Sequence, residues 1–170
     1  MKTGLYEEDF VLWAEAQAVA LRQAAEVGSN LPLDWYNIAE EIESLGRSQR
    51  RELKSRIANL TEHLLKLELS SASQPRAGWL ETVDRERREI ELLLEDSPSL
   101  RGELAAIASA VWPRTVKTVR EVLAERGEVS REASTEIDVN AYTVEQLVGD
   151  WLPDRAVSGP STEGASRGSP

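Results

Sequence analysis

The sequence contains no cysteine and one histidine, His63. The lack of cysteine excludes disulfides, thiolate metal sites, iron–sulfur clusters and cysteine nucleophiles. Metal binding and acid–base chemistry are therefore left to carboxylates. A Gly-rich phosphate loop, a G-x-S-x-G elbow and an H-E-x-x-H segment are also missing. We expect no cofactor.

Long apolar runs are missing as well. No stretch approaches the roughly 18 apolar residues that a membrane span needs. The opening residues, MKTGLYEEDFVLW, place Glu7, Glu8 and Asp9 where a secretory signal would be apolar. These features predict a cytoplasmic protein that does not enter a membrane.

The chain also lacks an excess of basic residues. Its net charge of -10 disfavours nucleic acid as the main partner, because nucleic-acid binding depends on neutralising phosphates with Lys and Arg. One local segment, RSQRRELKSR, could form a basic patch through Arg47, Arg50, Arg51 and Lys54. Nucleic-acid binding through this patch remains an alternative function.

Apolar residues recur with helical spacing along most of the chain, and strands with alternating apolar residues are missing. We predict an all-α fold, a single bundle of four main helices followed by a short C-terminal helix. One domain should span residues 1–154. Residues 155–170 are rich in Gly, Ser and Pro and are predicted to form a disordered tail.

The first two helices are predicted over about 7–28 and 34–67. The first should turn five apolar residues inward: Phe10, Trp13, Ala20, Leu21 and Ala24. The second has Asp34 as N-cap and should be one long helix, and whether it is bent or interrupted at Gly46 is left open by the sequence. Its apolar stripe comprises Trp35, Ile38, Ile42, Leu45, Leu53, Ile57, Leu60, Leu64 and Leu67.

Two further long helices and a short one are predicted after residue 78. The third buries Trp79, Val83, Ile90, Leu93 and Leu94 and ends near Asp96. The fourth opens at Ser97-Pro98, is kinked at Pro113 and ends at Gly127. Thr143 caps the short last helix.

The segment NIAEEIESLGRSQRREL, residues 37–53, concentrates charge on the long helix. At about 100° per residue, Glu40 and Glu43 share the solvent side with the basic residues, and Glu43 and Arg47 are spaced for an ion pair. A solvated face explains this pattern. The alternative is a metal-dependent (Mg/Mn) phosphohydrolase, in which the metal ligands would be Glu40, Glu41, Glu43 and His63.

A second set of polar residues lies along the flank of the apolar stripe. This polar seam comprises Glu41, Gln49, Glu52, Arg56, Asn59 and His63. Such residues either hydrogen-bond to neighbouring helices and fix their register, or form a site for a ligand. Both interpretations remain open from the sequence.

Four segments in order carry a family resemblance: YEEDFVLWAEAQAVALR, AEEIESLGRSQRREL followed by HLLKLE, DSPSLRGEL, and YTVEQLVGDWLP. Together they resemble the bacterial domain-of-unknown-function family twenty-nine, over about residues 5–154. The resemblance implies an all-α fold and a bacterial origin, and it implies no established activity. The family's signature run falls on Glu40, Glu41, Glu43, Gly46 and Arg47, with a histidine at His63.

The long helix, the polar seam and the lack of a complete catalytic constellation favour a function in binding. We predict a protein–protein interaction or regulatory module without catalytic activity, which associates with itself or with another protein.

Overall fold

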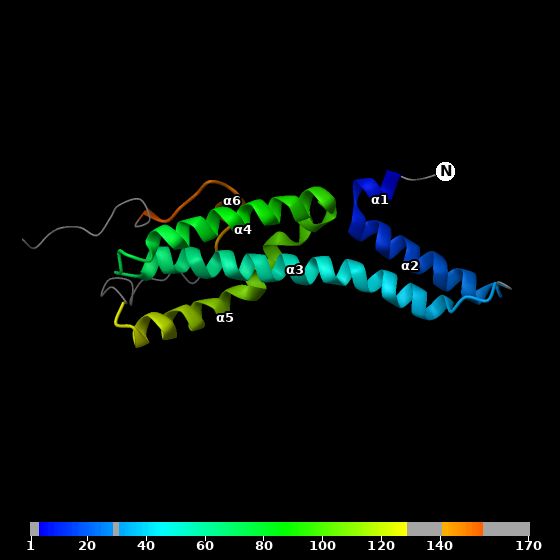
Figure 1. Cartoon of the computed structure of the whole chain (residues 1–170), viewed down its shortest axis with the longest axis horizontal. Coiled ribbons are helices and arrows are strands. Elements are labelled where there is room, and N and C mark those ends of the chain that lie inside the picture. The colour runs from blue at the N-terminus through cyan, green and yellow to red at the C-terminus, as the bar shows by residue number, and fades with distance from the viewer. Residues whose placement is uncertain (1–3, 29–30, 129–140, 155–170) are drawn as a thin grey trace, which may run out of the picture.

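A computed structural model of the chain describes residues 4–28, 31–128 and 141–154. Its elements are α1 (Gly4–Glu8), α2 (Phe10–Glu26), α3 (Trp35–Leu69), α4 (Arg76–Asp96), the 3-10 helix η1 (Pro98–Glu103), α5 (Leu104–Glu125) and α6 (Val144–Val148). The predicted all-α fold with four long helices and a short last one is confirmed (Figure 1). The tail predicted over 155–170 lies outside the described residues.

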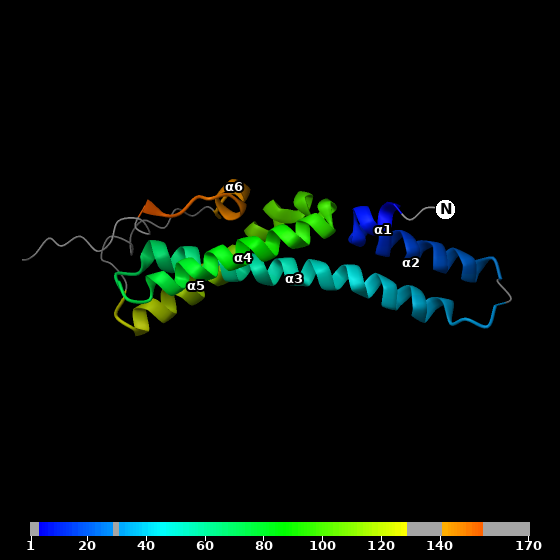
Figure 2. The ribbon, with the colours of Figure 1, turned by 45° about the horizontal axis from the view of Figure 1, so that its top comes forward.

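Helix α3 is the longest helix, and it runs along the molecule between α2 at one end and α4 and α5 at the other (Figure 1). Its 35 residues correspond to about 50 Å, and they continue through Gly46 as the apolar stripe predicts. Asp34 caps α3 by accepting a hydrogen bond from the Asn37 amide. We call α2 together with Trp35–Glu52 the arm, and the rest of α3 together with α4, α5 and α6 the bundle. Figure 2 shows the arm projecting from the bundle as a pair of helices.

The hydrophobic core lies in the bundle. From α3 it takes Leu53, Ile57, Leu60, Leu64 and Leu67, as predicted. The other long bundle helices contribute Trp79, Val83, Ile90, Leu93, Leu94, Leu104, Val111, Trp112, Val119 and Leu123. Val11 is the one described arm residue in this core cluster. The arm therefore lacks a core of large side chains.

The interior of the arm is made of small residues, which corrects the inward stripe predicted for the first helix. Ala20 is exposed, and Phe10, Trp13, Leu21 and Ala24 are half-buried. The buried positions of the arm are Val11, Ala14, Ala18, Ala39 and Gly46. A Cβ added at Gly46 would lie 3.7 Å from the Ala14 Cβ, so α2 and α3 approach too closely for large side chains between them. The large apolar residues are displaced to the flanks of this seam.

Two helix boundaries differ from prediction because of local hydrogen bonds. The first helix is interrupted at Asp9, whose extended backbone and side-chain bond to the Leu12 amide make it the N-cap of α2. The fourth helix begins as η1 before α5 continues past Pro113 to Glu125. Asp9 also accepts hydrogen bonds from the Ser99 amide at 2.7 Å and the Ser99 hydroxyl at 3.1 Å. Asp9 therefore fixes the start of α2 to η1 of the bundle.

Candidate functional site

One broad face of the arm is charged, and its charges are paired. Arg22 of α2 donates to Glu43 of α3, and Arg47 bonds to Glu40 and, at 3.3 Å, to Glu43. The bond from Arg22 holds the pKa of Glu43 below its ordinary value, despite the opposing effect of desolvation. These pairs join α2 to α3 along the face that the sequence predicts to be solvated.

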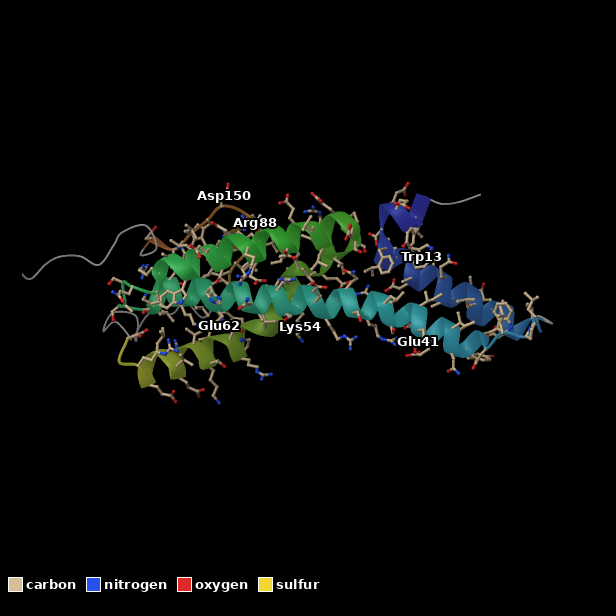
Figure 3. All side chains as sticks on the ribbon, in the orientation of Figure 1. Trp13, Glu41, Lys54, Glu62, Arg88 and Asp150 are labelled. Carbon is tan, nitrogen blue, oxygen red and sulfur yellow. The ribbon has the colours of Figure 1, made fainter. Side chains whose placement is uncertain are left out.

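The four candidate metal ligands do not converge. Glu40 and Glu43 are occupied by arginines, and Glu41 (labelled in Figure 3) is exposed and is turned away from Glu43 by the helical spacing. His63 lies 22 residues beyond Glu41 on the same continuous helix, about 33 Å away. No group of three or more potential metal ligands occurs among the described residues. A single ion cannot bind both Glu41 and His63.

Two of the four residues of the candidate basic patch, Arg47 and Arg50, are paired with carboxylates. Arg50 contacts Glu15 of α2 and Glu103 of η1, each at 2.8 Å, and Arg47 is held as described. Arg51 donates to the Ser48 hydroxyl, and Lys54 is exposed. Phosphate binding here would have to compete with these intramolecular pairs.

The polar seam divides into two parts. Its C-terminal part faces α4, where the buried Glu86 accepts hydrogen bonds from Asn59 at 2.8 Å and from Arg56 at 3.3 Å. Arg56 also bonds to Glu52, and the His63 Nδ1 lies 2.8 Å from the Asn59 carbonyl oxygen. Glu52, Arg56, Asn59 and Glu86 line one wall of a shallow groove of about 580 Å³.

The N-terminal part of the seam makes no such contacts. Glu41 is exposed, and the buried Oε1 of Gln49 has no hydrogen-bond partner within the described structure. The structure therefore gathers Glu52, Arg56 and Asn59 around Glu86 and leaves Glu41 and Gln49 apart.

Glu86 was not found from the sequence, although a signal was present. It occupies a helical position between Val83 and Ile90, so it interrupts an otherwise apolar stripe. A charged residue in such a place needs a buried partner, and Arg56 on the neighbouring helix is that partner.

Arg87 on α4 holds the C-terminal segment in place. Its guanidinium donates to the carbonyl oxygens of Gln146, Leu147 and Trp151. Burial lowers its pKa, although the nearby carboxylates of Asp84 and Asp150 oppose this effect. Arg87 also lines a cavity of about 310 Å³, together with Arg88 and Asp150, which are labelled in Figure 3. Because Arg87 already binds three carbonyl oxygens, its role beside this cavity is structural.

The second broad face of the arm has an uncharged centre, and Glu41 of α3 lies at its edge, one helical turn from Ile38 and from Leu45. It comprises Phe10, Trp13, Gln17 and Leu21 of α2 with Ile38, Ile42 and Leu45 of α3, and we call it the apolar arm face. It lies on the flank opposite the ion pairs that Arg22 and Arg50 make between the two helices. Gln17 and Leu45 are exposed, and the other five side chains are half-buried.

Helix α2 reverses the usual amphipathic pattern. Its three charged residues, Glu15, Arg22 and Glu26, lie on the flank of the charged face. The half of α2 that points away from α3 carries Leu, Trp, Ala, Gln and Val. The outer side of a surface helix is normally charged or polar, so this side has the composition of a contact surface.

Exposed apolar side chains are concentrated in the N-terminal part of the chain. Nine of the eleven exposed large hydrophobic residues among those described lie between Leu5 and Leu45, four of them in the arm and five in α1 and the turn after α2, and Leu45 belongs to the apolar arm face. Aromatic rings also gather here, where Tyr6 of α1 makes edge contacts with Phe10 and Trp13. Among the described residues, the bundle leaves two large hydrophobic side chains exposed, and the arm with α1 and the turn leaves nine.

Comparison with known proteins identifies the family. The family model described as "Domain of unknown function DUF29" matches residues 5–152. The chain belongs to this family. The resemblance seen in four segments is thereby confirmed, and two of these segments meet where Asp9 bonds to Ser99.

A solved structure shares the fold of this DUF29 member. It is an alpha-helical protein of unknown function from Rhodospirillum rubrum, 25% identical, with a TM-score of 0.72 over 88% of this chain and 92% of the other. A comparison with curated proteins gave no match. No described helix of the present chain has the length and hydropathy to cross a membrane.

Proposed function

We propose that this DUF29 protein is a protein–protein interaction module that acts by binding and not by catalysis, and that it binds through the apolar arm face. The observation that carries this proposal is the uncharged outer half of α2. On a solvent-exposed helix, charged residues on the outer side keep the protein soluble. Leu, Trp and Val at those positions are favourable only where another surface covers these apolar side chains.

The pairing of the charged groups supports the same proposal. Glu43 is engaged by Arg22, and Arg50 is engaged by Glu15 and Glu103. A phosphohydrolase needs carboxylates that are available for a metal, and a nucleic-acid-binding protein needs cations that are available for phosphates. The charged face of the arm uses these groups to hold its own helices together.

Site-directed photo-crosslinking tests this function. A benzophenone amino acid is introduced at Leu45, 45% exposed on the apolar arm face, or at Leu92, 55% exposed on α4 of the bundle. After illumination in the cells from which the gene comes, Leu45 should give a discrete protein adduct, identified by mass spectrometry, and Leu92 should not. Equal adducts at both positions, or none at Leu45, would contradict the proposal.

A further inference from the structure

We infer that the protein covering the apolar arm face is a second copy of this chain, so that two arms form an antiparallel four-helix bundle at the centre of a dimer. This inference rests on the proposed function and names its partner. Two packed antiparallel helices with one uncharged broad face are half of such a bundle. A two-fold dimer uses one surface patch on both copies, so the patch must be compatible with itself.

The centre of the apolar arm face meets this requirement because it carries no charge, and the exposed Glu41 lies at its edge. A copy of the face brings no unpaired charge against that centre, where a charge would be costly to bury. Its one central polar residue, Gln17, has an amide that both donates and accepts hydrogen bonds. Gln17 can therefore pair with the Gln17 amide of the second copy across a two-fold axis.

The dimensions of the arm fit a dimer interface. Helix α2 is 17 residues long, so the face is about 25 Å long, and two close-packed helices are about 18 Å wide. If both faces are treated as flat, their contact buries about 900 Å² in total. Interdigitating side chains and the flanking segments add to this area. Biological interfaces bury at least about 1,000 Å² in total, so the contacts of the flanking segments are needed to reach that area.

The shape of the molecule fixes the direction of the axis. The bundle lies at one end of the arm and the turn between α2 and α3 at the other (Figures 1 and 2). An axis that crosses the face at right angles to the helices, past Gln17 and Ile42, puts the two bundles at opposite ends of the dimer. An axis parallel to the helices would bring both bundles, each with a net negative charge, to the same end of the dimer.

The same axis accounts for exposed apolar residues at the two ends of the arm. Leu5 and Tyr6 of α1 are exposed at the bundle end, and Val27, Leu31 and Leu33 are exposed at the turn end. Reversal of the second copy brings its turn beside α1 of the first. Both groups would then contact apolar surface.

Charge substitution at the axis tests the dimer. Because Gln17 is exposed in the single chain, Gln17→Glu and Gln17→Lys should leave its fold intact. Wild-type protein should sediment at twice the chain mass of 18.9 kDa. Each variant alone should place like charges at the axis and raise the dimer dissociation constant at least tenfold. An equimolar mixture of the two variants should dimerise again, because the substituted side chains that meet at the axis then carry opposite charges.

The control is Leu92→Glu, which adds a charge at an exposed leucine of the bundle and should leave the dimer unchanged. A monomeric wild type at roughly 200 µM overturns the inference. So does a dimer that survives both Gln17 substitutions, or variants that fail to dimerise when mixed. A monomeric wild type with a Leu45 crosslink to a different protein would overturn the dimer and leave the proposed function standing, whereas a monomer without any Leu45 crosslink would contradict both.

Discussion

The carboxylate of Glu86 on α4 accepts a 2.8 Å hydrogen bond from the side-chain amide of Asn59 on α3. The same carboxylate contacts Arg56, one helical turn earlier on α3. Glu86 is 3% exposed, so this is a buried polar contact between the two helices of the bundle. It fixes the register of α4 against α3, because a shift by one turn would leave the charge of Glu86 buried without a partner.

Glu86→Ala should destabilise the fold by about 3 kcal/mol, because it leaves Asn59 and Arg56 without their buried acceptor. Glu89→Ala is the matched control. Glu89 also contacts Arg56, but its side chain is 42% exposed, so its loss should change stability by less than about 1 kcal/mol. Urea unfolding of both variants measures the difference, and equal effects would contradict the structural importance given to Glu86.

Asp9→Ala should destabilise the protein by about 2 kcal/mol. The substitution removes the N-cap of α2 and leaves the Ser99 amide without its acceptor. Glu8→Ala, at the exposed neighbouring residue, should have little effect. Amide hydrogen exchange should locate the loss of protection in Asp9→Ala at the start of α2 and in η1. Loss confined to α2 would show that Asp9 does not connect the arm to the bundle.

Gly46 offers a test of the close helix contact in the arm. Gly46→Ala should be neutral or stabilising by up to about 1 kcal/mol, because alanine favours helix and the new methyl group would meet Ala14 at an ordinary distance of 3.7 Å. Gly46→Leu should destabilise by about 2 kcal/mol, since the larger side chain forces α2 away from α3. Thermal unfolding distinguishes them. A harmless leucine would contradict the small-residue seam.

Tyr142 should make the protein sensitive to alkaline pH. Its phenol is buried and donates to Glu68, and both burial and this carboxylate raise its pKa far above the ordinary value of 10.0. Above about pH 10 the unfolded chain releases this proton and the native chain keeps it, so the stability contributed by Tyr142 is full below that pH and is lost as pH rises.

The measurement is the urea midpoint between roughly pH 8 and 11. Tyr142→Phe should lower stability by about 1 kcal/mol at pH 8, through loss of the hydrogen bond, and should show a shallower decline toward pH 11 than wild type. Tyr36→Phe, at an exposed tyrosine, should follow the wild-type curve. Identical pH slopes in all three proteins would contradict the assignment to Tyr142.

Salt should strengthen the dimer. Each chain carries a net charge of -10, and the centre of the face that joins the copies is uncharged, so the long-range interaction between copies is repulsive and is screened by salt. The dissociation constant should fall several-fold between about 50 and 500 mM sodium chloride, measured by sedimentation equilibrium. If salt instead weakened self-association, the interface would have to contain ion pairs, and the uncharged contact would be contradicted. Weakening by salt is also the behaviour of nucleic-acid binding, which depends on ion pairs with phosphates.

The sequence by itself determined the long helices and which of their faces are buried in the bundle. The stripe from Leu53 to Leu67 is buried because large apolar residues at helical spacing form a continuous face, and such a face is visible in a single chain. The ion pair of Glu43 and Arg47 was likewise readable, because its partners lie four residues apart on one helix. The family could be read from four segments in order.

Only the tertiary structure decided which apolar helix faces are covered by another helix. Phe10 and Trp13 on α2 have the spacing of core residues, yet the buried contact between α2 and α3 is made by small residues such as Ala14 and Gly46. The position of Glu86 opposite Arg56 was equally hidden, since it joins residues 30 apart on two helices. Periodicity shows which side of a helix is apolar, whereas coverage of that side depends on which helices are close enough to pack against it.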